Sequence, residues 1–535
     1  MLLGLAIRER GPSGRWRIRI RWGILFGLLA ITGVAGYFLL VTSFYFYFKK
    51  VEQFDEVSYW DMFTLIFNRS DHREKVGNYQ IEQAKHLLEE GEFRKALQYL
   101  QTGVIRAPEN LDGRTYLADF FMFGFNQEDR AIQILREGVP YAYDNPDYLK
   151  KYVQVLLSYQ EDDEVVQIAE NILASDPSPE VERIMALGAA TASYYRGRFD
   201  LAEDFLKDYN LDGDLEGALL SARISWDRGE RKVALAKLES DLGKFRNDEP
   251  IYELLSRFYR EMGDNAKARQ YAVLRNINAP LSVAPRIDLL QILSATDQKD
   301  RARKEAESIL YQFANDETSL QQLANYATDA GEVDLSRRIY ERALENDFKI
   351  APFALLLIES HVTAGDYQGA IAFSSELVKE KPEWIKKNWP IFNSLRSVAY
   401  YGLGNEDLTE LYLQQFLEAE EVRIGSLLAV SNRFQKLGGK EEAREILMQA
   451  YERNPDNQAA LSSLISLEIE LGNSAELGPY LEKLLKMRRP STTILQEAYK
   501  NLGSDKFIFT KGRAKLLIEL NGLISPADTN EVEPS

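Results

Sequence analysis

The sequence predicts an all-α protein in which one transmembrane helix precedes a superhelical solenoid of about twelve helix pairs. Two observations lead to this prediction. Residues 23–48 contain no charged side chain. Further along the chain, a pattern of glycine, aromatic residue, alanine and proline recurs about every 34 residues.

The uncharged run at residues 23–48 is long enough to cross a membrane. Its 26 residues would form a helix of about 39 Å, whereas a hydrocarbon core is about 30 Å thick. A cleavable signal peptide ending near residues 33–35 is the alternative, but the apolar run continues to Phe48 without a polar break. We therefore expect a membrane anchor that contacts lipid.

Positive charge is concentrated before this run and predicts its orientation. Six arginines precede it, while only two lysines follow it before the first acids; these eight residues are Arg8, Arg10, Arg15, Arg17, Arg19, Arg21, Lys49 and Lys50. By the positive-inside tendency, residues 1–22 are cytoplasmic and everything after residue 50 lies outside the cytoplasm, in the periplasm if the cell is bacterial.

The arginines in "RWRIRIRW", residues 15–22, alternate strictly with apolar residues. We interpret them as an orientation signal. Contact with anionic lipid or nucleic acid is the alternative, although about 20 residues are too few for a folded nucleic-acid reader.

The composition narrows the class of protein. The formal net charge is −17 although the first fifty residues are basic, so the remainder is strongly acidic and unsuited to binding phosphate backbones. We therefore expect no nucleic-acid partner. The chain has no cysteine, which excludes disulfides, thiolate metal sites and a cysteine nucleophile.

The repeat is clearest in "LLEEGEFRKALQYLQTGVIRAPEN", which begins at Leu87 and contains Gly91, Phe93, Ala96 and Pro108. Around the glycine, apolar residues recur at helical spacing on both sides, so each unit is an antiparallel helix pair. Glycine permits a left-handed turn, alanine allows two helices to approach closely, and proline ends the unit.

This pattern resembles the tetratricopeptide repeat, whose unit is 34 residues. The resemblance covers residues 78–490, and it departs from the family pattern in the second, third, eighth, tenth and twelfth units. The predicted alanine positions are Ala96, Ala131, Val166, Ala202, Ala234, Ala268, Ala302, Ser336, Ala370, Thr409, Ala443 and Leu477. The resemblance implies a solenoid whose concave wall, built from the first helix of each pair, binds an extended peptide or a helix of a partner protein.

Three segments lie outside the repeats. Residues 49–77 connect anchor and solenoid, and in a helix Trp60, Phe63, Ile66 and Phe67 would share a face that caps the first repeat or rests on the bilayer. Residues 491–523 are predicted to form two closing helices. Residues 524–535 are acidic and are predicted to be a disordered tail.

No catalytic or cofactor motif is found, so we expect a protein that is not an enzyme and has no cofactor. The three histidines, His72, His86 and His361, lie in different units and are interpreted as packing or surface residues rather than metal ligands. One loop carries Asp208, Asn210 and Asp212 before Gly213, as a calcium loop begins, but Leu219 stands where the bidentate acid belongs. An Asx turn between repeats is the preferred interpretation of that loop.

Two groups of residues are candidates for partner binding. Counting back from the turn glycines predicts that Arg223, Trp226, Arg257 and Arg260 face inward on two successive units. A 39-residue interval carries the insertion "KPEWIKKNWPIF", with Trp384, Lys386, Lys387 and Trp389 at the rim of the solenoid. The alternatives are a solvated helix face for the first group and tryptophans that plug an enlarged junction for the second.

These observations predict a membrane-anchored scaffold or assembly factor that binds protein partners outside the cytoplasm. A non-catalytic subunit that recruits or regulates an envelope enzyme, such as a hydrolase or a polysaccharide synthesis or export complex, is the main alternative. A glycan-binding solenoid is a third. The sequence carries no signal for an oligomeric state.

Overall fold

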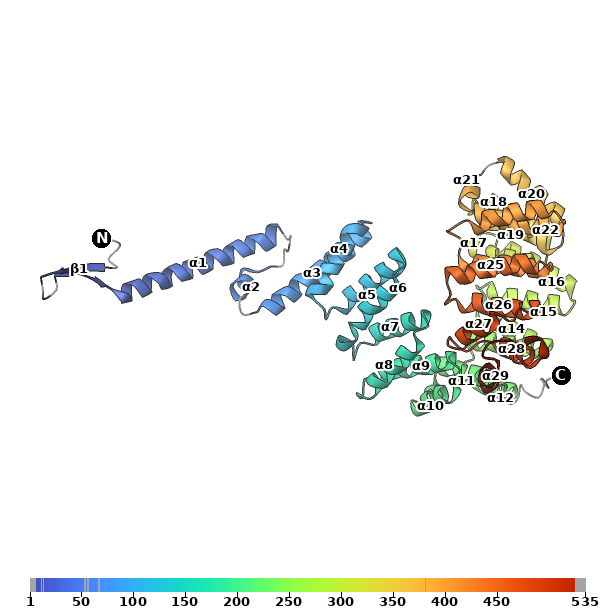
Figure 1. Cartoon of the computed structure of the whole chain (residues 1–535), viewed down its shortest axis with the longest axis horizontal. Coiled ribbons are helices and arrows are strands. Elements are labelled where there is room, and N and C mark those ends of the chain that lie inside the picture. Colours follow the sequence, from blue (N-terminus) through green and yellow to red (C-terminus); the bar gives the residue numbers. More distant parts are fainter. Residues whose placement is uncertain are drawn as a thin grey trace. The chain divides into compact units, whose positions relative to one another are not determined.

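The computed structural model describes residues 6–10, 12, 14–51, 54, 57–65, 68–380 and 382–524. The chain divides into two compact units, Met1–Met185 and Ala186–Ser535 (Figure 1). The side chains of Arg8, Arg17 and Arg19 lie outside the described part, as do Ile66, Phe67 and nearly all of the predicted tail.

The N-terminal segment forms a β-hairpin, which the sequence analysis did not anticipate. Strand β1 (Ala6–Arg10) pairs antiparallel with β2 (Trp16–Ile20), so that Ala6 lies opposite Ile20 and Arg10 opposite Trp16. The physical reason is that alternation of arginine with apolar residues has the period of two that a strand requires. The orientation signal is compatible with a hairpin and stays a prediction.

The uncharged run forms the single helix α1 (Trp22–Lys50), of 29 residues. Its length and composition would allow it to cross a membrane, and almost none of its most apolar stretch is buried in the structure. At 1.5 Å per residue it is about 43 Å long, which exceeds a hydrocarbon core of about 30 Å.

The connector packs on the C-terminal half of α1. Helix α2 (Tyr59–Thr64) begins with a capping box between Ser58 and Asp61. The ring of Phe63 lies 5.4 Å from that of Tyr37, and the hydroxyl of Tyr59 lies 2.8 Å from that of Thr42. Thus the connector lies against the candidate anchor rather than only capping the first repeat.

The remaining helices of the first unit form consecutive antiparallel pairs. They are α3 (Arg69–Glu89), α4 (Phe93–Arg106), α5 (Leu111–Asp119), α6 (Glu128–Arg136), α7 (Pro146–Ser158) and α8 (Asp162–Leu173). A π-helical turn, η2 (Phe120–Gly124), extends α5, and a 3-10 turn, η3 (Val139–Tyr141), follows α6. Helix α9 (Pro179–Tyr195) contains the boundary between the two units.

The second unit continues the same arrangement to the end of the described chain (Figure 1). Its helices are α10 (Phe199–Asp208), α11 (Leu215–Asp227), α12 (Arg231–Asp241), α13 (Glu249–Glu261), α14 (Asn265–Asn278), α15 (Ala284–Ala295), α16 (Lys299–Gln312), α17 (Glu317–Asp329), α18 (Val333–Glu345), α19 (Ile350–Thr363), α20 (Tyr367–Glu380), α21 (Glu383–Lys387), α22 (Trp389–Gly402), α23 (Glu406–Leu417), α24 (Ile424–Lys436), α25 (Lys440–Arg453), α26 (Gln458–Leu471), α27 (Leu477–Leu484), α28 (Thr492–Gly503) and α29 (Arg513–Leu523). Short 3-10 turns occur at η4 (Leu211–Gly213) and η5 (Asp505–Phe507).

The predicted solenoid of helix pairs is confirmed. From α3 to α27 the helices form twelve pairs, with the inserted α21 between two of them. Each predicted alanine position lies on the second helix of its pair and is buried, including Ala96, Ala268 and the bulkier Leu477. The turn glycines, Gly91 and Gly438 among them, have positive φ, as a left-handed turn requires.

In the second unit, the end of α9 and the residues after it contact the loop between α27 and α28, and we call this the closure contact. The backbone N–H of Arg489 donates to the carbonyl of Tyr195 at 2.8 Å, and Arg196 Nη1 donates to the carbonyl of Lys486 at 2.9 Å. The guanidinium of Arg488 lies 4.0 Å from the centre of the Tyr195 ring, and that of Arg489 lies 5.2 Å from the ring of Phe199. The predicted closing helices α28 and α29 complete this end of the unit.

Candidate functional site

Trp226, from the first predicted group, lies on α11 and stacks on Phe258 of α13. The two rings are nearly parallel, with centroids 3.9 Å apart and an interplanar angle of 7°. The indole Nε1 donates to Glu261 at 3.1 Å, and the guanidinium of Arg231 lies 5.7 Å from the indole ring. The tryptophan is therefore held in one orientation, with part of its surface exposed.

The three arginines of this group lie on the same two helices. Arg223 and Arg257 are exposed, and Arg257 Nε lies 3.8 Å from Glu261, the residue that also accepts from the indole of Trp226. Arg260 donates to Gln291 at 3.1 Å and lies 3.7 Å from Asp288. The structure thus brings Trp226 and Arg257 together around Glu261, and two of the three arginines have an acid of this chain within 4 Å.

The second predicted group lies at the insertion, which forms the extra helix α21. Trp384 and Trp389 both contact the fully buried Phe392, with ring centroids 6.5 Å and 5.8 Å away. Lys386 and Lys387 are exposed. Trp384 is half-buried against this ring, whereas Trp389 is exposed beside the lysines.

The possible calcium loop has the geometry of a turn between helices. Asp208 ends α10, Asn210 has a φ of 52°, and Asp212 lies in the 3-10 turn that precedes α11. The ammonium of Lys244 donates to the carbonyl of Gly213, so a cation of the chain already occupies this side of the loop. In the part of the chain that the structure describes, no group of three acidic or histidine side chains is arranged to hold a metal ion.

The histidines take packing and surface positions. His72 is buried against the ring of Phe48, 4.6 Å away, and burial lowers the pKa of its imidazole. His361 is also buried, and its Nδ1 lies 2.7 Å from Asp366. His86 is exposed.

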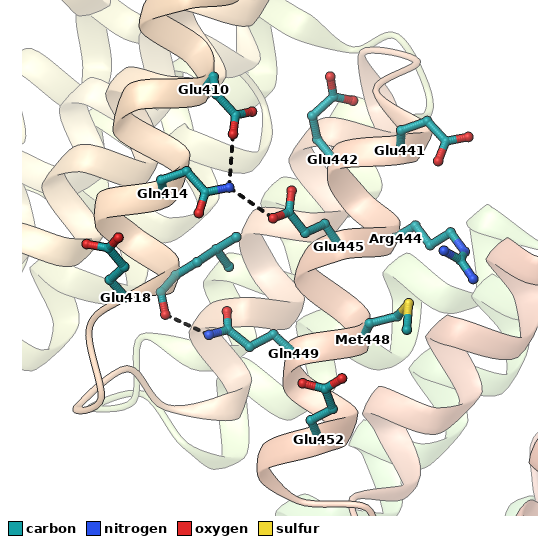
Figure 2. A pocket seen from close by; sticks show the side chains of 11 residues that line it. Glu410, Gln414, Glu418, Glu441, Glu442, Arg444, Glu445, Met448, Gln449 and Glu452 are labelled. Atoms are coloured by element: carbon teal, nitrogen blue, oxygen red, sulfur yellow. Dashed lines mark hydrogen bonds between the residues drawn. The ribbon is translucent and has the colours of Figure 1, made fainter.

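An acidic groove of about 700 Å³, which the sequence analysis missed, lies between α23 and α25 (Figure 2). These are the second helices of two neighbouring pairs. Gln414 joins the two walls by donating to Glu410 and Glu445 at 3.0 Å each. Most of the lining is glutamate: Glu410, Glu418, Glu441, Glu442, Glu445 and Glu452. These glutamates have the same spacing in the sequence as the acids of any solvated helix face. Their spacing alone therefore could not predict a groove.

An exposed aromatic cluster in the first unit was also missed, although the string "FFMFGF" at residues 120–125 signals it. We call it the aromatic platform, and it consists of Phe93, Tyr116, Phe120, Phe123 and Phe125. The Phe120 ring lies 6.4 Å from Phe93 and 6.0 Å from Phe125. Phe120 is half-buried and the other four are exposed. Side chains of this size are ordinarily buried, so such a group indicates a contact surface.

Comparison with known proteins identifies the class of repeat. Residues 322–383, which span α17 to the start of α21, match the family model described as tetratricopeptide repeat. A search of curated protein sequences gave no match. The chain therefore carries tetratricopeptide repeats, a fold that is typically a scaffold for protein interaction.

The comparison with solved structures gave matches of low sequence identity and low TM-score. PilW, titled a widely conserved type IV pilus biogenesis factor, is 17% identical over 45% of this chain and 96% of its own, with a TM-score of 0.29. A structure of Naa15/Naa10 bound to HypK-THB is 14% identical over 94% of this chain and 81% of its own, with a TM-score of 0.29. The TPR domain of P58(IPK) is 15% identical over 74% of this chain and 99% of its own, with a TM-score of 0.22.

Proposed function

We propose that this protein is a single-pass membrane scaffold that holds protein partners outside the cytoplasm and serves the assembly of an envelope complex. The observation that carries the proposal is the joining of one long, exposed apolar helix to twelve helix pairs of an interaction fold. The described residues contain no metal-binding group, and the sequence contains no catalytic motif. The activity we propose is therefore binding.

Support for the anchor comes from how α1 is packed. Its N-terminal half presents apolar side chains such as Phe26 and Ile31 to the surroundings, and burying these side chains in lipid is favourable. One face of its C-terminal half contacts the connector, through Tyr37, Val41 and Tyr45. Leu39, Leu40 and Phe46 on the same half stay exposed, so apolar surface continues along the whole helix, as a membrane span requires.

The anchor and its orientation can be tested together. We expect the full chain to stay in membranes after alkaline carbonate extraction, and a chain that begins at residue 51 to be released. A reporter that is active only outside the cytoplasm should work when fused after Ser535. Moving the six N-terminal arginines to the far side of α1 should reverse this result, and an active cytoplasmic reporter on the unaltered chain would contradict the orientation.

For the partner surface, we propose the concave face that includes Trp226 and the arginines of α11 and α13. Trp226 offers a fixed aromatic surface beside Arg223 and Arg257, which are both exposed. Arginine binds carboxylate and phosphate groups through paired hydrogen bonds. A partner with carboxylate, phosphate or uronic-acid groups fits this surface, and it would replace Glu261 and Asp288 as the acid near Arg257 and Arg260.

Replacing Arg223, Arg257 and Arg260 by alanine should weaken binding of a partner identified by cross-linking in native membranes. We expect a loss of about tenfold and a smaller dependence of affinity on salt, because charge-assisted hydrogen bonds to the partner are removed. Helix content and membrane insertion should not change. The triple replacement of Arg269, Arg301 and Arg303, which are exposed arginines of α14 and α16, is the matched control.

Shortening the insertion at residues 383–389 to the 34-residue repeat length separates the two predicted binding sites. If binding survives the loss of the three arginines but fails in the shortened chain, the partner binds the insertion around Lys386 and Lys387. That result would overturn the assignment to α11 and α13.

A further inference from the structure

The aromatic platform of the first unit exposes an unusual amount of aromatic surface. Phe123 is 76% exposed and Phe93 is 61% exposed, and Tyr116 and Phe125 are also exposed. Phe93, Phe120 and Phe125 form a connected group, because Phe120 contacts both of the other rings. Tyr116 and Phe123 lie next to them along α5 and η2. The platform therefore combines residues from α4, α5 and η2 into one surface.

The π-helical turn η2 explains why these rings remain outside. It places Phe121 and Met122 in the core, where both are buried, and leaves Phe123 exposed and Phe120 half-buried. The guanidinium of Arg130 lies 4.1 Å from the Phe121 ring, and the N–H of Gln127 donates to the carbonyl of Phe121 at 2.9 Å. The turn is thus fixed by its buried residues. Phe125 also packs on the ring of Phe121, 5.9 Å away. π-helical turns are frequent at functional sites.

The position of the platform along α3 argues against lipid as its occupant. The contacts with α1 and α2 occur at the start of α3, where His72 meets Phe48 and Lys75 binds Asp61 at 2.9 Å. Phe93 follows the other end of α3. A helix of 21 residues separates the two ends by about 31 Å, so the platform lies far from the part of the chain that meets the membrane.

The charge around the platform indicates what would bind it. Five exposed acids flank the rings, namely Glu89, Glu90, Glu92, Glu128 and Asp129. Four basic residues lie among them, Lys85, Arg94, Lys95 and Arg130. Lys85 lies 5.5 Å from the ring of Tyr116, Lys95 binds Glu92 at 3.2 Å, and Arg130 covers Phe121. A second copy of this chain would bring the same acids into contact, which disfavours self-association through this surface.

We propose that the aromatic platform is a second partner-binding surface, and that it takes an amphipathic helix of another protein with aliphatic residues on one face and lysine or arginine beside them. The aliphatic side chains pack on the phenylalanine rings, and the basic residues pair with the flanking acids. This mode of binding an apolar helix face is common in protein recognition. It goes beyond the proposed function because it does not use the arginines of α11 and α13.

Labelled model helices test the proposal with the full chain in nanodiscs of neutral phosphatidylcholine. Three synthetic peptides of equal length should be compared by fluorescence anisotropy: leucine with lysine, leucine with glutamate, and serine with lysine. The leucine–lysine helix should bind at least about tenfold more tightly than either of the others, since the site requires both an apolar face and positive charge.

Replacing Phe93 and Phe123 by serine should weaken binding of the leucine–lysine helix by about tenfold or more. The control is Phe509→Ser, which removes a 90% exposed phenylalanine of the second unit and should change nothing. Circular dichroism should show unchanged helix content in each variant. Equal binding to parent and double variant would overturn the proposal.

A photoreactive residue at position 123 distinguishes the possible occupants in native membranes. A protein adduct that maps to an apolar, basic helix supports the proposal. An adduct to lipid, or to a second copy of the chain, overturns it. Because the arginines of α11 and α13 remain intact in these experiments, failure here is distinguishable from failure of the proposed function.

Discussion

Replacing Gly77 by alanine should destabilise the first helix pair, α3 and α4. A Cβ atom at this position would lie 2.7 Å from the backbone nitrogen of Ala107 and 2.8 Å from the carbonyl oxygen of Gly103. Both neighbours belong to the backbone and cannot move aside unless the helices separate. We expect a loss of about 1–3 kcal/mol in the free energy of unfolding, as in other cases of overpacking.

Gly425 provides the matched control, because it is also helical but a Cβ there would meet no atom within 4 Å. Gly425→Ala should be neutral or stabilise α24 by up to about 1 kcal/mol, since alanine favours a helix more than glycine does. Hydrogen exchange with mass spectrometry checks both variants. Faster exchange in α3 and α4 is expected for Gly77→Ala only, and equal exchange in the two variants would contradict the close helix crossing.

Replacing Arg196, Arg488 and Arg489 by alanine should open the closure contact of the second unit. The variant loses two cation–π contacts and the side-chain hydrogen bond from Arg196 to the carbonyl of Lys486. Together these contribute about 2–3 kcal/mol, which corresponds to a shift of about thirtyfold to 150-fold toward the open form. The helices themselves should remain folded, because each is stabilised by its neighbours in the chain.

Distances between spin labels at Lys207→Cys and Lys515→Cys measure this opening. The chain has no natural cysteine, so these two sites alone would be labelled. We expect one narrow distance in the parent and a broader, longer distribution in the triple arginine variant. The same exposed arginines of α14 and α16 described above are the control, and a narrow distance that persists in the variant would show that other contacts hold the ends together.

Local sequence patterns predicted the repeats well. A repeat needs a small residue where two helices meet and a left-handed turn between them, and both requirements act within one unit. Ala268 is buried where two helices approach closely, and Gly263 adopts the left-handed turn before it. The turn also forms where glycine is absent: Asn126 and Gln160 take the positive φ in the second and third units. Asparagine tolerates this conformation better than most residues, which explains one of these departures.

Features that depend on distant residues could not be predicted in this way. Arg196 and Lys486 are 290 positions apart, and no periodic pattern marks their meeting. The inward direction of Arg257 and Arg260 stays a prediction from helix spacing, and their neighbours Glu261 and Asp288 became evident only in three dimensions. The β-hairpin could have been predicted, because the period of two is present in the sequence. We interpreted this segment from its positive charge instead.

The closure contact also bears on how proteins of this kind can diverge. An open array of repeats gains or loses a unit at little cost, because each unit contacts only its neighbours. In the second unit, one added helix pair between α10 and α28 would shift and rotate everything after it, and Arg489 would no longer reach Tyr195. Among homologues that keep the contact, the number of pairs after α9 should therefore be constant, while the pairs between α3 and α8 are free to vary in number.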